Sequence, residues 1–254
     1  MDNMADSKTL AGTTADGNEA GLHTVERGGA ARIDRWQKDR QKAFKAVPAG
    51  GKTVKYMDKE FLVYPDTFWP FTDSQPLVRK LRVRPGESVL DVGTGSGVIA
   101  VFACYAGARR VLAVDINPSA LRSARHNAST HGYGDTMEVR RSDLFREIGN
   151  EQFDVITANL PFRNKEAHDV VAQSQWDTDF QTNTRFFEDV GRCLKPGGRI
   201  YFAHANFGAI GEIRRLARAA GFSLREVGTV SADQAQTKTF YAFILKRRHQ
   251  APSA

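Results

Sequence analysis

The chain is poor in cysteine and has no long apolar run. Its 254 residues include two cysteines, Cys104 and Cys193, and neither has a partner at metal-ligand spacing. Neither a disulfide framework nor a zinc site is therefore expected. No apolar run approaches the roughly 18 residues that span a bilayer, and Met1–Asp6 lacks the basic and then apolar regions of a secretory signal. We expect a protein of the reducing cytoplasm without a membrane segment.

Histidine is also sparse. The chain has six histidines, and His126, His131, His168 and His204 are scattered without the spacing of metal ligands. No metal is therefore predicted. His204 follows an expected strand, where it is a candidate pocket residue and base, with a structural role as the alternative.

The charge is unevenly distributed along the chain. The net charge of +7 is carried by residues 31–254, because residues 1–30 are acidic on balance. Residues 1–30 also lack apolar periodicity, which predicts a disordered tail, and a second short tail is expected at 249–254. An excess of basic residues suits RNA or another acidic partner, but moderate basicity is also common in metabolic enzymes.

Residues 31–75 are predicted to form an N-terminal helix, a hairpin and a lid segment. Apolar residues recur at helical spacing among arginines and lysines in Ala31–Val47, which predicts a basic amphipathic helix. Such a helix either docks its apolar stripe on the domain or faces RNA. Two β-rich runs, Thr53–Met57 and Glu60–Tyr64, predict the hairpin. The main domain is expected over residues 76–248.

Expected strands and helices alternate regularly from Ser88 onward. The expected strands are Ser88–Val92, Arg110–Asp115, Met137–Arg141, Phe153–Ala158 and Arg199–Ala203. The expected helices are Ser74–Val83, Val98–Ala106, Pro118–Thr130, Gln181–Leu194 and Gly211–Ala220. This alternation predicts an α/β fold, a doubly wound and mostly parallel sheet covered on both faces. Two further β-rich runs, Ser223–Val230 and Thr239–Lys246, predict a C-terminal antiparallel strand pair at one edge.

The strongest local signal is a glycine-rich turn after the first of these strands. The sequence Val89-Leu90-Asp91-Val92-Gly93-Thr94-Gly95-Ser96-Gly97 joins a strand to a helix, and its glycines allow a sharp turn and close approach of a ligand. A dinucleotide fingerprint would have Gly or Ala in the place of Val98. Asp91 would repel a pyrophosphate, but it can hold the ammonium group of a methionine moiety. The charge of Asp91 therefore argues against NAD.

Acidic residues also end the next two expected strands. Asp115 can accept hydrogen bonds from both ribose hydroxyls of an adenosine, and Asp143 can accept the amino N–H of adenine. Because the carboxyl ends of parallel strands meet at one crevice, we expect these groups to bind one ligand. The predicted cofactor-binding residues are Asp91, Gly93, Thr94, Gly95, Gly97, Asp115, Ile116, Asp143, Leu144 and Asn159.

These segments resemble the Class I S-adenosylmethionine-dependent methyltransferases over roughly residues 60–246. The resemblance implies the Rossmann-like fold of that class and S-adenosyl-L-methionine as the cofactor. It implies the following positions: the methionine and ribose part of the cofactor at Asp91, Gly93 and Gly95, the ribose at Asp115, and the adenine near Asp143.

The fourth expected strand is followed by Asn159-Leu160-Pro161-Phe162, the predicted catalytic residues. The side-chain oxygen of Asn159 and the main-chain carbonyl of Leu160 can accept both N–H bonds of a planar nitrogen and aim its lone pair at the methyl group, so that catalysis rests on positioning. Pro161 stiffens the turn, and Phe162 offers a flat surface to a planar substrate. These residues resemble the N-P-P-Y/F motif of amino-methyltransferases. Leu160 replaces the first proline of the motif, which leaves the substrate class open.

A second segment resembles the HemK-type glutamine methyltransferases. Val63–Ser74 is similar to their V-Y-x-P-x-x-D-S/T segment, with Asp66–Trp69 inserted. In those enzymes the segment covers the cofactor and helps to form the substrate pocket. This resemblance makes Trp69, Phe71 and Asp73 candidate pocket residues. The alternatives are a core position for either aromatic residue and a helix cap for Asp73.

Several functions fit the sequence. The first is methylation of an amide, amine or guanidine nitrogen of a small polar metabolite, or of a protein side chain such as glutamine. For a cationic acceptor, Glu166, Asp177 and Asp179 are candidate partners. The second is methylation of an rRNA or tRNA base, which the basic helix and the Lys246-Arg247-Arg248 run favour. Oxygen methylation and a binding module without turnover are further alternatives, because the fold does not fix the acceptor.

Overall fold

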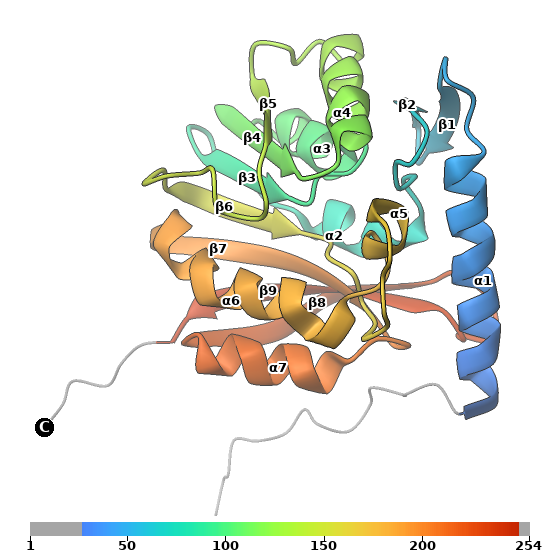
Figure 1. Ribbon diagram of the computed structural model, residues 1–254. Coiled ribbons are helices and arrows are strands. Elements are labelled where there is room, and N and C mark those ends of the chain that lie inside the picture. The colour runs from blue at the N-terminus through green and yellow to red at the C-terminus, as the bar shows by residue number, and fades with distance from the viewer. Residues whose placement is uncertain (1–26, 249–254) are drawn as a thin grey trace, which may run out of the picture.

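The computed structural model describes residues 27–248 (Figure 1). Of the expected tails, residues 1–26 of the predicted 1–30 and all of 249–254 lie outside these residues. The strands are β1 (Lys52–Tyr56), β2 (Lys59–Val63), β3 (Ser88–Val92), β4 (Arg110–Asp115), β5 (Met137–Arg141), β6 (Phe153–Ala158), β7 (Leu194–Ala205), β8 (Phe222–Ser231) and β9 (Thr239–Arg247). The helices are α1 (Arg27–Lys45), α2 (Gln75–Lys80), α3 (Val98–Tyr105), α4 (Pro118–Thr130), α5 (Val170–Gln173), α6 (Gln181–Cys193) and α7 (Ile210–Ala219), with 3-10 turns at Thr72–Ser74 and Thr178–Phe180.

The main sheet has the strand order β5-β4-β3-β6-β7-β9-β8, and β1 and β2 form a separate hairpin. Strands β3 to β7 run parallel, and β9 pairs antiparallel with both β7 and β8. The predicted fold class is therefore confirmed. Because β3 lies between β4 and β6, the strand order reverses beside its carboxyl end, where sheets of this kind bind ligands.

The strands bury both of their faces, as continuous apolar strands in a doubly wound sheet do. Leu90 and Ile156 face a core that is completed by α6 and α7. Val89 and Val155, their neighbours in sequence, face the opposite core, which α2, α3 and α4 complete. Figure 1 shows the two sets of helices on opposite faces of the sheet.

The N-terminal segments pack onto this domain, and the predicted hairpin is confirmed. The side chain of Asn127 in α4 accepts a hydrogen bond from the Leu62 amide at 2.8 Å and donates one to the Leu62 carbonyl at 2.9 Å. The amide of Tyr64 donates to the hydroxyl of Ser123 at 3.0 Å. Helix α1 buries Ile33 and Phe44, so the expected docking of its apolar stripe is also confirmed.

Three boundaries differ from those predicted by more than two residues. Helix α1 begins at Arg27, inside the predicted tail, and its first turn contains Gly28 and Gly29, whose low helix propensity hides this start in the sequence. Helix α2 ends at Lys80, because Leu81 enters the core in an extended conformation with ψ of 128°. Strand β7 begins at Leu194, ahead of the expected Arg199, because Leu194 already pairs with Phe153 across a register shift.

Two short elements were not predicted. Helix α5 and the 3-10 turn Thr178–Phe180 lie in the connection between β6 and α6. Elements of this length are too short to show an apolar period in the sequence. Asp169 caps α5 by accepting a hydrogen bond from the Ala172 amide at 2.8 Å.

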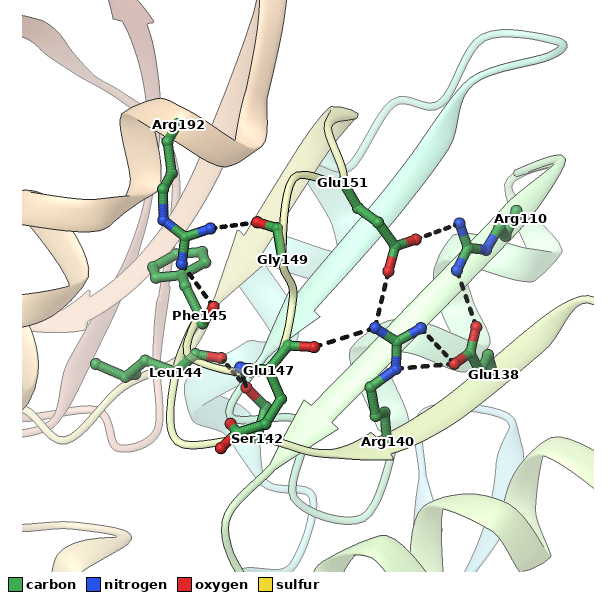
Figure 2. Close-up of polar contacts among 10 residues, drawn as sticks. All are labelled: Arg110, Glu138, Arg140, Ser142, Leu144, Phe145, Glu147, Gly149, Glu151 and Arg192. Atoms are coloured by element: carbon green, nitrogen blue, oxygen red, sulfur yellow. Dashed lines mark hydrogen bonds and ion pairs between the residues drawn. The ribbon is translucent and has the colours of Figure 1, made fainter.

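A network of charged side chains fixes the edge of the sheet around β5 (Figure 2). Its members are Arg110 of β4, Glu138 and Arg140 of β5, and Glu151, joined by hydrogen bonds of 2.6 to 2.9 Å. On the other side of the same loop, Arg192 of α6 donates to the carbonyls of Phe145 and Gly149. The loop between β5 and β6, which carries Asp143, is thus held from both sides.

Within residues 27–248, no helix combines the length and the apolar character needed to cross a membrane. Both cysteines are buried and free. In this same part of the chain, no three His, Cys, Asp or Glu side chains gather in a group that could hold a metal ion.

Candidate active site

A pocket that encloses about 1050 Å³ of empty space, its opening to solvent included, lies at the carboxyl ends of β3, β4 and β6, beside the reversal of strand order. Its floor comes from the three strand tips: Gly93–Ser96, Asp115–Asn117 and Asn159–Phe162. Its other walls come from α1, the lid segment, α5 and the residues after it, and the ends of the antiparallel strands: Trp36, Gln37, Phe68, Pro70, Phe71, Asp73, Ser74, Val170, Gln173, Ser174, Gln175, Phe207 and Phe240.

The glycines of the turn between β3 and α3 have two different functions. Gly93, Gly95 and Gly97 all have positive φ angles, of 69°, 55° and 82°, which favour glycine. A Cβ atom at Gly95 would meet only the Phe68 carbonyl, at 3.9 Å, so the turn leaves room for a ligand there. A Cβ atom at Gly97 would lie 3.0 Å from the Cα of Ala124. Gly93, Thr94 and Gly95 line the pocket, whereas Gly97 allows α3 to pack closely against α4.

Asp115 and Ile116 line the pocket at the tip of β4. The two carboxylate oxygens of Asp115 accept hydrogen bonds from the amides of Gly95 at 2.8 Å and Asn117 at 2.9 Å. Burial raises the pKa of Asp115, and these bonds oppose the shift. A carboxylate has about four acceptor sites, so Asp115 keeps the capacity to bind ribose hydroxyls. Ile116 is 46% exposed and presents an apolar surface beside it.

Asp91 lies beneath the turn and does not line the pocket. It is 1% exposed, and its carboxylate accepts hydrogen bonds of 2.6 Å from the hydroxyls of both Thr94 and Thr157. Burial raises the pKa of Asp91 to about 6. The geometry therefore gives Asp91 a structural part in shaping the turn, and its direct contact with an ammonium group stays a prediction.

Asp143 and Leu144 also lie outside the pocket lining. Asp143 accepts a hydrogen bond from Arg185 of α6 at 2.7 Å. Leu144 has a positive φ of 52° and packs in the core between the sheet, α6 and α7. Their contact with adenine stays a prediction.

Asn159 is oriented by Asp73, which lies in the 3-10 turn Thr72–Ser74. Its Nδ2 donates a hydrogen bond to Oδ2 of Asp73 at 2.5 Å. Because a carboxylate accepts hydrogen bonds, this contact determines which end of the Asn159 amide is the oxygen. Oδ1 of Asn159 is buried and accepts no hydrogen bond from the described residues.

The three residues after Asn159 line the pocket as well. The carbonyl of Pro161 accepts a hydrogen bond from the side chain of Asn183 at 3.0 Å, and the carbonyl of Phe162 accepts one from the Ala209 amide at 3.2 Å. The Leu160 carbonyl accepts none from residues 27–248. Asn159 Oδ1 and the Leu160 carbonyl are thus two unpaired acceptors from consecutive residues that line the pocket.

Aromatic rings form one side of the pocket. Phe71 lies 5.8 Å from Trp36 and 6.2 Å from Phe240 between ring centroids, and Phe207 lies 6.0 Å from Trp36 and 6.1 Å from Phe162. These flat apolar surfaces suit a planar or partly apolar substrate group.

Of the four candidate pocket residues, Phe71 and Asp73 line the pocket and the other two do not. The ring of Trp69 packs against Phe44 at 5.5 Å. His204 is 1% exposed and lies against Phe162, with 5.1 Å between the ring centroids. Burial lowers the pKa of His204 to about 3, which keeps it neutral at physiological pH.

The acids that were candidate partners of a cationic acceptor do not reach the pocket either. Asp177 caps α6, because its carboxylate accepts hydrogen bonds from the amides of Thr182 at 2.8 Å and Asn183 at 3.0 Å. Glu166 and Asp179 are exposed.

Several pocket residues were not predicted, above all those of α1. Oε1 of Gln37 accepts hydrogen bonds from Trp176 at 2.8 Å and Arg163 at 3.1 Å. Gln175 also lines the pocket, and its buried Oε1 has no partner among residues 27–248. A signal for Gln37 was present, because it lies at helical spacing from Ile33 on the apolar stripe, where a polar residue is unusual.

Comparison with known proteins places these features in a family. A family model for the methyltransferase small domain matches residues 72–222. The chain is 33% identical over 148 residues to the ribosomal protein L11 methyltransferase of Geobacillus thermodenitrificans, which covers 58% of this chain and 41% of that protein. The chain thus spans about two fifths of the length of this curated relative.

Two solved structures share the fold. Ribosomal protein L11 methylase from Lactobacillus delbrueckii subsp. bulgaricus superposes with a TM-score of 0.55 at 21% identity, covering 72% of this chain and 82% of that one. The Mtq2–Trm112 complex of E. cuniculi gives a TM-score of 0.55 at 21% identity, covering 72% of this chain and 99% of that one.

The pocket fits the cofactor of this family. The turn is open where a Cβ atom at Gly95 would stand, Asp115 keeps acceptor capacity, and the lining includes buried unpaired acceptors on Asp73 and Asn159. The chain belongs to the methyltransferase small domain family of Class I S-adenosylmethionine-dependent methyltransferases, and the cofactor of this family is S-adenosyl-L-methionine.

Proposed function

We propose that the chain transfers a methyl group from S-adenosylmethionine to a nitrogen atom of a protein side chain. The proposal rests on one observation: two neighbouring hydrogen-bond acceptors, Asn159 Oδ1 and the Leu160 carbonyl, have no donor among the described residues. A primary amide or amine brings two N–H donors to such a pair, whereas a hydroxyl group brings one. A buried acceptor without a partner costs about 1–3 kcal/mol. The pair therefore favours nitrogen over oxygen.

The residues of the chain act by positioning the acceptor. S-Adenosylmethionine supplies, when bound, a methyl group carried on a positively charged sulfur. Asn159 and Leu160 hold the two N–H bonds, and Asp73 fixes the Asn159 amide. The aromatic wall around Phe71 and Phe162 limits access of water. Alignment of this kind lowers a barrier by several kcal/mol, on the order of 7 or more in favourable cases.

No strong base is required. An amide or amine nitrogen becomes acidic once it carries the additional methyl group, so its proton passes to water after transfer. His204 does not serve as the base, because it lies behind Phe162 and outside the pocket lining. The pocket therefore works through hydrogen-bond acceptors and shape.

A protein acceptor is supported by the names of the curated relatives, which are ribosomal protein L11 methyltransferases. A second candidate is an RNA base, and the exposed face of α1 favours it. Arg32, Arg35 and Lys38 are exposed on this helix, whose opposite side contributes Trp36 and Gln37 to the pocket. A basic surface beside a pocket suits a polyanion.

The deciding experiment offers three acceptor pools to the purified chain with methyl-labelled S-adenosylmethionine. The pools are ribosomal proteins freed of RNA, total RNA freed of protein, and the small-molecule fraction of a cell extract. We expect label in protein, recovered after acid hydrolysis as an N-methylated amino acid. Label confined to RNA, with steep loss of transfer as salt is added, supports the second candidate. Label in a base-labile ester or ether contradicts nitrogen transfer.

A further inference from the structure

A half-buried arginine without an acidic partner at salt-bridge distance lies behind the pocket wall. The guanidinium carbon of Arg40 in α1 lies 4.3 Å from the ring centroid of Phe71, 5.6 Å from that of Trp36 and 5.8 Å from that of Phe68. All three rings line the pocket. Nε and Nη2 of Arg40 are buried and donate no hydrogen bond to any described residue.

This environment is unusual for a charged group. Arginine is seldom buried unless an acceptor pairs with it, and each buried donor without a partner calls for an explanation. The aromatic faces attract the cation but accept no conventional hydrogen bond from it. Burial lowers the pKa of Arg40, and the charge of Asp73 opposes that shift. The guanidinium is thus arranged to receive an anion.

Asp73 carries the complementary unpaired atom. It is 2% exposed and lines the pocket, two positions after Phe71, on which Arg40 stacks. One carboxylate oxygen of Asp73 holds Asn159, while Oδ1 accepts no hydrogen bond from residues 27–248. Free donors and a free acceptor of opposite charge therefore lie on either side of Phe71, with Asp73 in the pocket lining and Arg40 behind the ring.

An α-amino-acid group, which carries a carboxylate and an ammonium, matches this pair. The cofactor of the family ends in such a group, and Asp91, the acid beneath the turn, already accepts hydrogen bonds from two threonines. We propose that Arg40 and Asp73 bind the amino-acid end of S-adenosylmethionine, with Arg40 at the carboxylate and Asp73 at the ammonium. Arg40 stands behind Phe71, so contact requires a side-chain rotation of the kind that binding commonly produces.

The inference reaches beyond the family match and the proposed function. Arg40 belongs to α1, which precedes the matched residues 72–222. It concerns the grip on the cofactor and does not depend on which nitrogen is methylated. The experiment below measures binding without transfer, so its failure and the failure of the proposed function are separate results.

The test compares two ligands by calorimetry. S-Adenosylhomocysteine carries the amino-acid end, and 5′-methylthioadenosine lacks it. Arg40→Met is expected to weaken the binding of S-adenosylhomocysteine at least about tenfold, the usual effect of losing a hydrogen bond to a charged group. The affinity for 5′-methylthioadenosine is expected to stay within about twofold of the wild-type value. Asp73→Asn is expected to show the same selective loss.

The matched control is Arg122→Met. Arg122 also stacks on an aromatic ring, 3.6 Å from the centroid of Tyr64, but it is exposed and does not line the pocket. Both affinities should stay at the wild-type values. If Arg40→Met does not fold, the carboxyl methyl ester of S-adenosylhomocysteine removes the same contact in the wild type. The wild type is then expected to bind the ester about tenfold more weakly than the free acid. In Arg40→Lys, which lacks the planar fork, this ratio of the two affinities is expected to be smaller.

Three results overturn the assignment. Equal losses for both ligands in Arg40→Met indicate that Arg40 only packs α1 onto the domain. Unchanged binding of S-adenosylhomocysteine indicates that Arg40 does not bind the carboxylate of the cofactor. Equal binding of the free acid and its methyl ester by the wild type excludes a cationic contact at that carboxylate.

Discussion

Asp73 accepts a hydrogen bond of 2.5 Å from the side-chain amide of Asn159, which lies 86 residues further along the chain. Asp73 belongs to the 3-10 turn Thr72–Ser74, and Asn159 directly follows β6. The contact therefore couples the position of the Thr72–Ser74 turn to the orientation of the Asn159 amide. Without it, the Asn159 amide is free to rotate, and its oxygen no longer stays aligned with the Leu160 carbonyl.

Replacement of Asn159 by alanine tests the acceptor pair. The variant removes one of two acceptors that fix the substrate nitrogen and keeps the turn after β3 intact. We expect turnover to fall by about 100-fold or more, with affinity for S-adenosylhomocysteine within about threefold of the wild type. Single-turnover transfer to the labelled acceptor and calorimetry measure the two quantities.

Asn150→Ala is the matched control for this variant. Asn150 is exposed in the loop before β6 and does not line the pocket, so its loss should change neither turnover nor affinity. An Asn159→Ala variant that turns over at the wild-type rate removes the reason for choosing nitrogen.

The residues at the strand tips were predictable because their position follows from topology. Asp115 ends one parallel strand and Asn159 directly follows another, and parallel strands end at the same edge of a sheet. Asp91 ends a strand too, but its hydrogen bond to Thr157 joins it to a residue of a neighbouring strand, 66 positions away. Because of this hydrogen bond, Asp91 supports the turn, although the sequence made it a candidate to bind the cofactor. A contact between residues so far apart cannot be recognised from a local sequence pattern.

The wall formed by α1 was not predictable in the same way. The apolar period identified the helix and its docking face, but the point of docking depends on contacts such as that between Gln37 and Trp176, 139 positions apart. Arg40 shares the apolar face with Trp36 and Phe44. A charged residue on an apolar face is unusual, and this feature of Arg40 was visible in the sequence. Its interpretation depends on Asp73, whose position relative to Arg40 only the structure gives.

Asp115 and Asp91 should respond differently to substitution. Asp115→Ala is expected to weaken S-adenosylhomocysteine by about 10- to 100-fold, because the ribose hydroxyls lose a charged acceptor. The control, Asp135→Ala, removes an exposed acid outside the pocket and should leave the affinity unchanged. Calorimetry measures both. If Asp115→Ala binds S-adenosylhomocysteine as tightly as the wild type does, Asp115 does not bind the ribose.

Asp91 makes the stability of the chain dependent on pH. Burial raises its pKa from 3.8 to about 6, so the folded chain holds a proton that the unfolded chain has released between these values. The resulting contribution to stability is complete below pH 4 and is lost as the pH rises through 6. Relative to Asp91→Asn, the free energy of unfolding of the wild type should fall by about 3 kcal/mol from pH 4 to pH 7. Urea unfolding at several pH values measures this difference, and parallel curves for the two proteins contradict it.

Arg199 and Glu87 form the most enclosed ion pair among the described residues. Their side chains are 9% and 13% exposed, and two hydrogen bonds of 2.8 and 2.7 Å join β7 to the loop before β3. Glu87→Ala leaves the arginine buried without its partner, which costs about 3 kcal/mol in the free energy of unfolding. Urea unfolding at neutral pH measures this loss. Glu212→Ala, which breaks an exposed pair with Arg215 in α7, is the control and should change little.

The same pair has a pH dependence opposite to that of Asp91. The hydrogen bond from Arg199 lowers the pKa of Glu87 below its ordinary value of 4.5, against the effect of burial. The stabilisation is therefore complete above pH 4.5 and is lost as the pH falls through the lowered pKa. The stability difference between the wild type and Glu87→Ala should shrink in acid, while that between the wild type and Asp91→Asn should shift in the opposite direction. If both differences change in the same direction on acidification, one of the two carboxylates is not in the environment described.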